Sequence, residues 1–148
     1  MSVASKKSSK SKGSKEAAAK ERGSFSFADG SVYNGEFTGA DGVKTRKGKG
    51  TYTSAAESYN GTWENDRQDG QGVYKFNSGA VYKGSFSEGA FHGQGQYTFA
   101  DGAYYNGQWS MNKMHGSGIY VDAQKIEYQG SFFNGMFDSG KSFVSVRP

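Results

Sequence analysis

Two histidines are the residues in this sequence that could most readily act as metal ligands or as a general base. His92 and His115 lie 23 residues apart, and each is followed by Gly-x-Gly-x-Tyr, so they occupy the same slot of a repeated pattern. In a sheet of stacked hairpins, equivalent slots lie two strands apart, or about 10 Å. Two ligands of one zinc ion, each about 2 Å from it, cannot be that far apart. We therefore predict no metal site, no catalytic residue and no cofactor.

The Gly-x-Gly pairs could also suggest a phosphate-binding loop. A dinucleotide fingerprint needs a third glycine and a helix after it, whereas here strand-like residues such as VYKF or QYTF follow. The sequence contains no nucleophile elbow, no Walker loop and no His-Glu-x-x-His motif. Acidic residues such as Asp29, Asp66 and Asp101 stand at expected turns, where a solvated carboxylate is ordinary. We predict that the protein is not an enzyme.

The glycines belong to an internal repeat. Tyr-x-Gly-x-aromatic occurs five times, with steps of 26, 23, 23 and 23 residues, at 33–37, 59–63, 82–86, 105–109 and 128–132. Gly-x-Gly-x-Tyr follows the first four of these, at 48–52, 70–74, 93–97 and 116–120. The fifth copy loses it, because Ser139 and Lys141 stand where the glycines belong, and residues 23–30 resemble half a repeat.

Each repeat predicts a β-hairpin. Alternation places Tyr82, Gly84 and Phe86 on one face of a strand, and the chain has 23 Gly but no Leu, which disfavours a helical core. A strand with this much glycine is reasonable if an aromatic ring from a neighbouring strand lies across the bare backbone. We predict an all-β fold: one elongated, twisted, antiparallel β-meander of about eleven strands over residues 23–148.

The array resembles the MORN (membrane occupation and recognition nexus) repeat family over about residues 23 to 144. The resemblance implies a single sheet of stacked hairpins that acts as a non-catalytic protein–protein scaffold and takes a helix or an extended peptide as partner. It also implies a place in a cilium, a flagellar axoneme or another cytoskeletal assembly, within a larger complex. A likeness of NGTW and YYNGQW to choline-binding cell-wall repeats is weaker, because the Gly-x-Gly-x-Tyr half does not fit those repeats.

Two groups of side chains are candidates for partner contacts. A single sheet has no second layer, so the first-strand aromatics are expected to be partly core and partly a binding face. These residues are Tyr59, Trp63, Tyr82, Phe86, Tyr105 and Trp109. The first repeat is longer than the others, and the extra residues predict a basic contact loop with Lys44, Arg46, Lys47 and Lys49.

The positive charge is concentrated in residues 1–22, where seven Lys or Arg face two Glu, whereas the remaining residues carry 11 Lys or Arg and 12 Asp or Glu. We predict a largely disordered basic tail over 1–22 with a short helix at 15–22. The tail could bind an acidic surface such as that of tubulin. The alternative is that the protein is a peripheral membrane adaptor, which binds anionic phospholipids through the tail and the 44–49 loop. Nucleic acid is disfavoured, because the repeats themselves are not basic.

The sequence has no cysteine, no apolar stretch long enough to span a bilayer and no secretory h-region. We expect a cytoplasmic protein that is neither secreted nor membrane-spanning.

Overall fold

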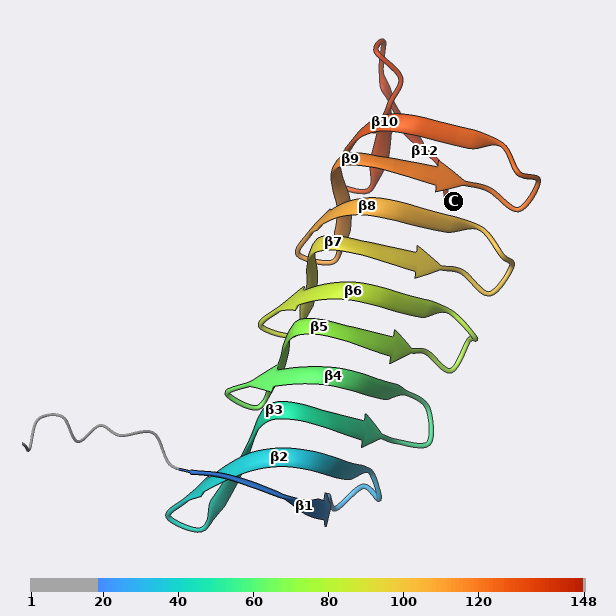
Figure 1. Cartoon of the computed structure of the whole chain (residues 1–148). Coiled ribbons are helices and arrows are strands. Elements are labelled where there is room, and N and C mark those ends of the chain that lie inside the picture. The colour runs from blue at the N-terminus through green and yellow to red at the C-terminus, as the bar shows by residue number, and fades with distance from the viewer. Residues whose placement is uncertain (1–18, 148) are drawn as a thin grey trace, which may run out of the picture.

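The computed structural model describes residues 19–147, and these form a single twelve-stranded antiparallel sheet with no helix. The strands follow one another in chain order along the long axis of the molecule (Figure 1). They are β1 Lys20–Ser26, β2 Val32–Ala40, β3 Val43–Thr53, β4 Ser58–Glu64, β5 Arg67–Lys75, β6 Val81–Ser87, β7 Ala90–Thr98, β8 Tyr104–Ser110, β9 Lys113–Val121, β10 Glu127–Phe133, β11 Met136–Asp138 and β12 Phe143–Ser145. The predicted all-β meander of stacked hairpins is confirmed.

Turns of two kinds join the strands, and each kind lines one long edge of the sheet (Figure 1). Within a hairpin the two turn residues both have positive φ, as at Asn65 (54°) and Asp66 (70°), which is the type I′ geometry that matches strand twist. In three of the turns between hairpins the residue with positive φ is a glycine, Gly30, Gly79 or Gly102, whereas before β10 it is Lys125 at 74°. Asn, Asp and Gly at these places therefore explain why the chain reverses with so few residues.

The core of the sheet is a row of tyrosines that lie across paired glycines. In the third repeat Gly84 of β6 faces Gly95 of β7, and a Cβ atom on Gly95 would fall on the ring of Tyr82. The same relation holds for Tyr33 with Gly50, Tyr59 with Gly72, and Tyr105 with Gly118. The five tyrosines with the lowest exposure are at most 1% exposed: Tyr33, Tyr59, Tyr82, Tyr105 and Tyr120. One sheet thus buries a core without a second layer.

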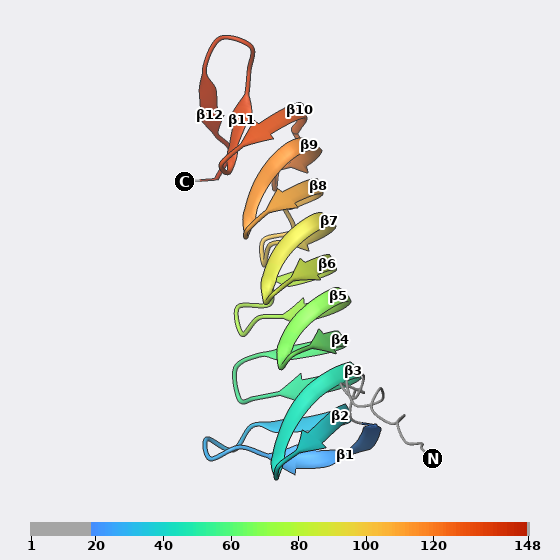
Figure 2. The same cartoon turned by 90° about the vertical axis from the view of Figure 1, so that its left-hand side faces the viewer.

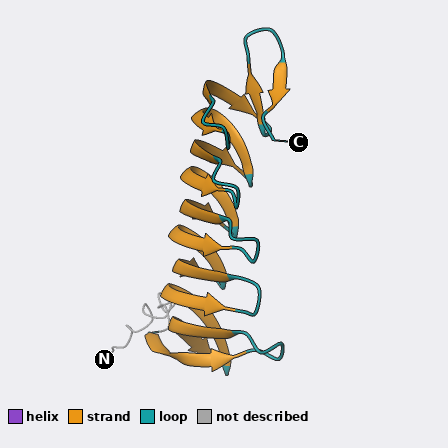
Figure 3. Cartoon of the chain, turned by 90° about the vertical axis from the view of Figure 1, so that its right-hand side faces the viewer, coloured by secondary structure: helices purple, strands orange, loops and turns teal. Residues whose placement is uncertain are grey.

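The tyrosine hydroxyl has a separate role at a β-bulge. The register of the β6–β7 ladder shifts between Gly84 and Phe86, so Ser85 is left without a partner in the ladder. The Tyr82 hydroxyl donates a hydrogen bond of 2.8 Å to the Ser85 carbonyl. Equivalent bonds of 2.6 to 2.9 Å link Tyr33 to Glu36, Tyr59 to Thr62 and Tyr105 to Gln108. A bulge bends its strand, and the strands are visibly bent in Figures 2 and 3.

The two glycines of Gly-x-Gly-x-Tyr are required for different reasons. Gly93 has a φ of 98°, opposite the bulge, where a residue with a Cβ atom would be strained. Gly95 lies under the Tyr82 ring, where a Cβ atom would clash. Neither requirement can be met by Ser139 or Lys141, and the fifth repeat departs from the pattern at that point.

The fifth repeat explains why the sheet has twelve strands instead of the expected eleven. β11 pairs with β10 only at Phe132–Phe137 and Phe133–Met136. The chain then turns at Ser139–Ser142, where the Ser139 N–H donates to the Ser142 carbonyl at 3.0 Å, and returns as β12. This last hairpin projects from the end of the stack (Figure 2). Without glycines to receive the Tyr128 ring, a full second strand cannot lie against β10.

The predicted helix over 15–22 is wrong where the structure describes it. Lys20, Glu21 and Arg22 belong to β1 and pair with Thr38, Phe37 and Glu36 of β2. Strand pairing satisfies the backbone groups of an otherwise open edge, which an isolated short helix cannot do. The remaining predicted tail, residues 1–18, lies outside the described residues.

We expect the substitution Gly95→Ala to destabilise the protein by about 2–3 kcal/mol, because the new methyl group overlaps the buried Tyr82 ring. Urea unfolding followed by circular dichroism measures this change. Gly39→Ala is the matched control, because it is also a strand glycine but its nearest atom is a Glu21 carboxylate oxygen at 3.8 Å. Equal effects at the two positions would contradict the ring-over-glycine account.

We expect Tyr82→Phe to cost about 1–2 kcal/mol, because the Ser85 carbonyl at the bulge loses its donor while the ring remains. The control is Tyr104→Phe, because none of the hydrogen bonds among the described residues involves the Tyr104 hydroxyl. Unfolding free energies that do not differ between the two variants would show that the hydroxyl does not support the bulge.

Candidate functional site

The six first-strand aromatics predicted as a partner-binding face lie in the core. Tyr59, Tyr82 and Tyr105 are 0% exposed, and Trp63, Phe86 and Trp109 are 3%, 3% and 7% exposed. The indole N–H groups of Trp63 and Trp109 donate to the carbonyls of Gly50 and Gly95 at 3.1 and 3.0 Å. These rings hold neighbouring hairpins together, so they offer a partner almost no surface.

A second set of aromatics on the same face of the sheet remains accessible. We call these residues the outer rings, because they come from the second strand of each hairpin and from the turn that follows it. The outer rings are only partly buried or exposed: Phe27, Tyr52, Tyr74, Phe76, Tyr97 and Phe99. The rings form two contacting groups. The Phe27–Tyr52 centroids are 6.1 Å apart, and in the second group the Tyr74–Phe76 and Phe76–Tyr97 centroids are 4.7 Å and 5.7 Å apart, with Phe99 next to Tyr97. This row is the accessible part of the aromatic face.

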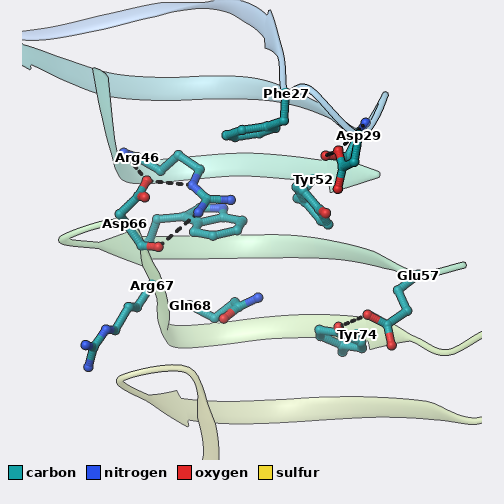
Figure 4. A pocket seen from close by; sticks show the side chains of 11 residues that line it. Phe27, Asp29, Arg46, Tyr52, Glu57, Asp66, Arg67, Gln68 and Tyr74 are labelled. Atoms are coloured by element: carbon teal, nitrogen blue, oxygen red, sulfur yellow. Dashed lines mark hydrogen bonds and ion pairs between the residues drawn. The ribbon is translucent and has the colours of Figure 1, made fainter. Parts of the chain in front are cut away.

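A hollow of about 380 Å³ lies at the first two hairpins, next to the outer rings Phe27, Tyr52 and Tyr74. Trp63 also lines it. The charged residues around it carry both signs of charge (Figure 4). The charged residues around it are Asp29, Arg46, Glu57, Asp66 and Arg67. The Tyr74 hydroxyl donates to a Glu57 carboxylate oxygen. The hollow therefore combines ring faces with carboxylates, a combination that suits a cationic side chain.

The predicted basic loop at 44–49 is part of strand β3, so it is not a loop. The extra residues lengthen the first hairpin, whose turn is at Asp41 and Gly42. Arg46 occupies the slot that holds Phe91 and Met114 in later repeats, two residues before the first glycine of the pair. Its guanidinium carbon lies 4.3 Å from the Trp63 ring centroid, and its Nε donates to Asp66 at 2.7 Å. Arg46 is therefore a partly buried residue that packs on the core and has a paired charge.

The other three basic residues of that segment also make contacts within the protein. The Lys44 ammonium lies 5.3 Å from the Phe25 ring centroid and 5.7 Å from that of Phe37. Lys47 forms an ion pair with Glu64 at 3.3 Å. The Lys49 backbone N–H donates to Glu36 at 2.8 Å. The segment therefore presents less free positive charge than its sequence predicts.

A second hollow, of about 400 Å³, lies on the same face near the other end of the array. Its walls include the outer rings Phe76, Tyr97 and Phe99, together with Phe91 and Trp109. Arg147, which follows β12, also lines it. The Arg147 guanidinium carbon is 3.7 Å from the Phe99 ring centroid, and its Nη1 donates to Asp101 at 3.1 Å. This end of the row is therefore partly covered by the chain itself.

The opposite face of the sheet also has a hollow, of about 580 Å³, but its lining is polar. It is formed by short polar side chains and glycines, and Ile119 is its one large apolar residue: Gln94, Asn106, Gly107, Ser117, Gly118, Ile119, Gln129, Gly130 and Ser131. Buried apolar and aromatic anchors supply most of the free energy of protein binding. The aromatic face is therefore the stronger candidate.

The two histidines have structural contacts. His92 Nδ1 accepts a hydrogen bond from the Met111 N–H at 3.2 Å, and the His115 ring centroid lies 5.4 Å from that of Phe133. Residues 19–147 contain no cluster of three or more His, Asp or Glu with metal-binding geometry.

Burial and hydrogen bonding shift several pKa values at this face. Burial raises the pKa of Tyr33, Tyr82 and Tyr105 to about 12. Burial also works to raise the pKa of Asp66, but hydrogen bonds from Arg46 outweigh it, so the pKa of Asp66 is lowered. The phenols of the core thus stay neutral, while the carboxylate beside Arg46 stays charged.

The outer rings were missed as site residues in the sequence, although a signal for them was present. The segments GTYT, GVYKF and GQYTF place an aromatic residue two and sometimes four positions after the second glycine. These positions share the aromatic face, and Tyr52, Tyr74 and Tyr97 lie directly opposite the buried first-strand tyrosines in the ladders. Arg46 stands two residues before Gly48, just as Phe91 stands two residues before the first glycine of its pair. This spacing would have placed Arg46 in the slot of Phe91.

These features define an open array of β-hairpins whose single sheet carries its core and a row of accessible rings on one face. Comparison with known families agrees with this class: the MORN repeat model matches residues 59–81, 82–104, 105–124 and 128–138, more than half of the chain. The protein belongs to the MORN repeat family. MORN repeats form a non-enzymatic family and serve in general as protein-binding or membrane-binding modules. The first hairpin is outside the matched ranges, although Tyr33 packs over Gly50 as the other tyrosines do over their glycines.

No curated protein matches the chain. Within residues 19–147, no helix has the length and apolar character needed to cross a membrane.

The raised tyrosine pKa values predict loss of stability at high pH. The pKa of about 12 for Tyr33, Tyr82 and Tyr105 in the folded protein lies above the ordinary value of 10.0. The contribution of the buried neutral phenols is therefore complete below pH 10 and is lost as the pH rises from 10 toward 12. Melting temperatures by circular dichroism should fall across this range. Phenolate absorbance should show these tyrosines titrating above pH 10; if all tyrosines titrate near pH 10 in the folded protein, the prediction is wrong.

Proposed function

We propose that the protein is a non-catalytic interaction scaffold that binds a protein segment, helical or extended, along the outer rings. The observation that carries the proposal is the row of accessible rings on a sheet face that has no covering layer. Two hollows lie along this row, one at each end of the array. An extended chain of about 10 residues covers roughly 33 Å, which is the spacing of about seven strands.

The family resemblance supports a further part of the proposal, which is a structural role in a ciliary, axonemal or other cytoskeletal assembly in the cytoplasm. A narrower resemblance, to MORN repeat-containing protein 2, is carried by residues 76–86, 91–109 and 121–132 and is also a proposal.

The alternative of a peripheral membrane adaptor has less support at the 44–49 segment. Arg46 and Lys47 pair with Asp66 and Glu64, and Lys44 lies over two rings, so three of the four cations are already engaged. An anionic surface would have to compete with those contacts. The remaining basic residues of this alternative, as of a tubulin contact, fall mostly within 1–18, outside the described residues.

The proposal is tested by selecting binding peptides from a random display library on the full chain and measuring their affinity for two variants. Phe76→Ser removes an outer ring without touching the buried tyrosines, and we expect it to weaken binding about tenfold. Val73→Ser is the matched control, because Val73 is partly exposed on the opposite face two strand positions before Lys75. Peptides that bind Phe76→Ser as tightly as the unchanged protein would contradict the proposed face.

Vesicle sedimentation separates the membrane alternative. The membrane adaptor would be favoured if the full chain bound anionic vesicles more strongly than it binds peptides, and if Phe76→Ser left the vesicle binding unchanged.

A further inference from the structure

At one end of the aromatic face, the protein binds one of its own arginine side chains in a cradle of three residues. The Arg147 guanidinium lies over the Phe99 ring at 3.7 Å from the centroid. Its Nη1 donates to Asp101 Oδ2 at 3.1 Å and to the Tyr120 hydroxyl at 3.3 Å. We call Phe99, Asp101 and Tyr120 the filled cradle. It combines a ring face, a carboxylate and a phenol, all suited to a planar cation with several N–H donors.

The repeat places the same three residue types at the other end of the face. Phe27 and Asp29 belong to FADG at 27–30, as Phe99 and Asp101 belong to FADG at 99–102, and Tyr52 corresponds to Tyr120. We call Phe27, Asp29 and Tyr52 the open cradle.

The geometry of the two cradles is closely similar. The Phe27–Tyr52 ring centroids are 6.1 Å apart at an interplanar angle of 61°, compared with 6.3 Å and 70° for Phe99–Tyr120.

The aspartates of the two cradles accept the same backbone hydrogen bond, and Asp29 Oδ1 also accepts one from the Ser31 hydroxyl at 2.6 Å. Asp29 Oδ1 accepts the Ser31 N–H at 2.9 Å, and Asp101 Oδ1 accepts the Ala103 N–H at 3.0 Å. In the filled cradle Asp101 Oδ2 is the oxygen that meets Arg147. Among the hydrogen bonds of residues 19–147, Asp29 Oδ2 has no donor. The open cradle therefore presents the same acceptor with no cation on it.

The exposure of the rings is consistent with this difference. Tyr120 is 1% exposed, whereas Tyr52 is partly exposed and Phe27 is 36% exposed. All three residues of the open cradle line the 380 Å³ hollow and lie around one side of it (Figure 4).

Arg46 lies nearby without occupying the aspartate of this cradle. Its guanidinium carbon is 5.3 Å from the Phe27 centroid and 5.8 Å from the Tyr52 centroid, but its Nε and Nη2 donate to the side chain and backbone carbonyl of Asp66 and not to Asp29. Its charge is thus neutralised by Asp66. The hollow also contains Glu57 and Arg67, so its three carboxylates outnumber its two guanidiniums, which favours an incoming cation.

We propose that the open cradle Phe27–Asp29–Tyr52 binds an arginine side chain supplied by the partner segment, in the way that the filled cradle binds Arg147. This inference rests on the proposed function and adds a requirement to it: the partner segment carries an arginine at the end that meets the first hairpin. Lysine fits less well, because an ammonium group cannot stack on Phe27 as a plane while donating to Asp29.

The experiment uses N-acetyl-valyl-arginine amide as the probe, because it reproduces Val146–Arg147, and follows the amide resonances of the full chain by NMR. We expect saturable shifts at Phe27, Ser31 and Tyr52, with a dissociation constant on the order of 1 mM for so small a ligand. The lysine analogue should shift them several-fold less, and the citrulline analogue, which has the same shape without the charge, should not shift them.

Two variants sharpen the test. Asp29→Asn keeps an oxygen for the Ser31 N–H but loses the charge, and it should weaken the probe at least fivefold. Its matched control is Asp41→Asn, which removes the same charge from a hairpin turn of the same repeat and should leave the affinity unchanged. Arg147→Gln should empty the filled cradle, so that the arginine probe produces new shifts at Phe99 and Tyr120.

The outcomes separate this inference from the proposed function. Shifts at Phe27 that are the same for the arginine, lysine and citrulline probes, or that survive Asp29→Asn, overturn the arginine cradle. So do shifts that appear only at Phe99 after Arg147→Gln. If display peptides still depend on Phe76 in these cases, the scaffold function stands and only the cradle is rejected. If no peptide depends on Phe76 but the probe binds as expected, the cradle stands and the extended partner surface is rejected.

Discussion

The structure depends on one contact, in which a tyrosine ring lies across two facing glycines of adjacent strands. The Tyr82 ring covers Gly95, which faces Gly84 on the strand that carries Tyr82. The Tyr82 hydroxyl donates a hydrogen bond to the Ser85 carbonyl at the bulge. A sheet normally needs a second layer to bury apolar surface. Here the missing glycine side chains provide the volume that a ring requires, so a single layer encloses its own core. The tryptophans and phenylalanines of the same strands extend this core from hairpin to hairpin, with Tyr59 and Phe86 centroids 4.9 Å apart.

The same contact decides which rings remain accessible. Each tyrosine of the first strand reaches toward the second strand and covers its glycine, so the ring two positions further along that second strand is displaced toward the open side. Tyr74 and Tyr97 are examples, and Phe76 and Phe99 follow them in the turns. The accessible row is thus a consequence of how the core is built. An array with this geometry carries accessible rings from Phe27 to Phe99, with differences between repeats supplied by single substitutions such as Arg46 in the slot of Phe91.

The two ends of the array differ from its middle in ways that bear on recognition. At the first hairpin, four extra residues extend β2 and β3, and Arg46 places a cation over Trp63 while Asp66 of the next turn neutralises it. At the last repeat, the loss of both glycines ends the ring-over-glycine pattern, and the chain turns back through β12. Arg147 then reaches Phe99 and Asp101 in the third repeat. The departures from the repeat therefore bring the protein's own cations to the aromatic face.

The sequence alone determined the architecture, because the spacing of Tyr-x-Gly-x-aromatic and Gly-x-Gly-x-Tyr states which residues share a face and where the chain must turn. It also determined that rings pair with glycines, since both types alternate with the period of a strand. Only the tertiary structure decided which rings are buried, because Tyr59 and Tyr74 have the same type, share a face and lie opposite each other in the β4–β5 ladder, yet only Tyr59 lies over a glycine of the neighbouring strand. Arg46 was predicted in a loop because its charge hides the core slot that it occupies. The pairing of Lys20–Arg22 with β2, and the meeting of Arg147 with Asp101, 46 residues apart, depend on contacts between distant segments, and such contacts leave no local pattern in the sequence.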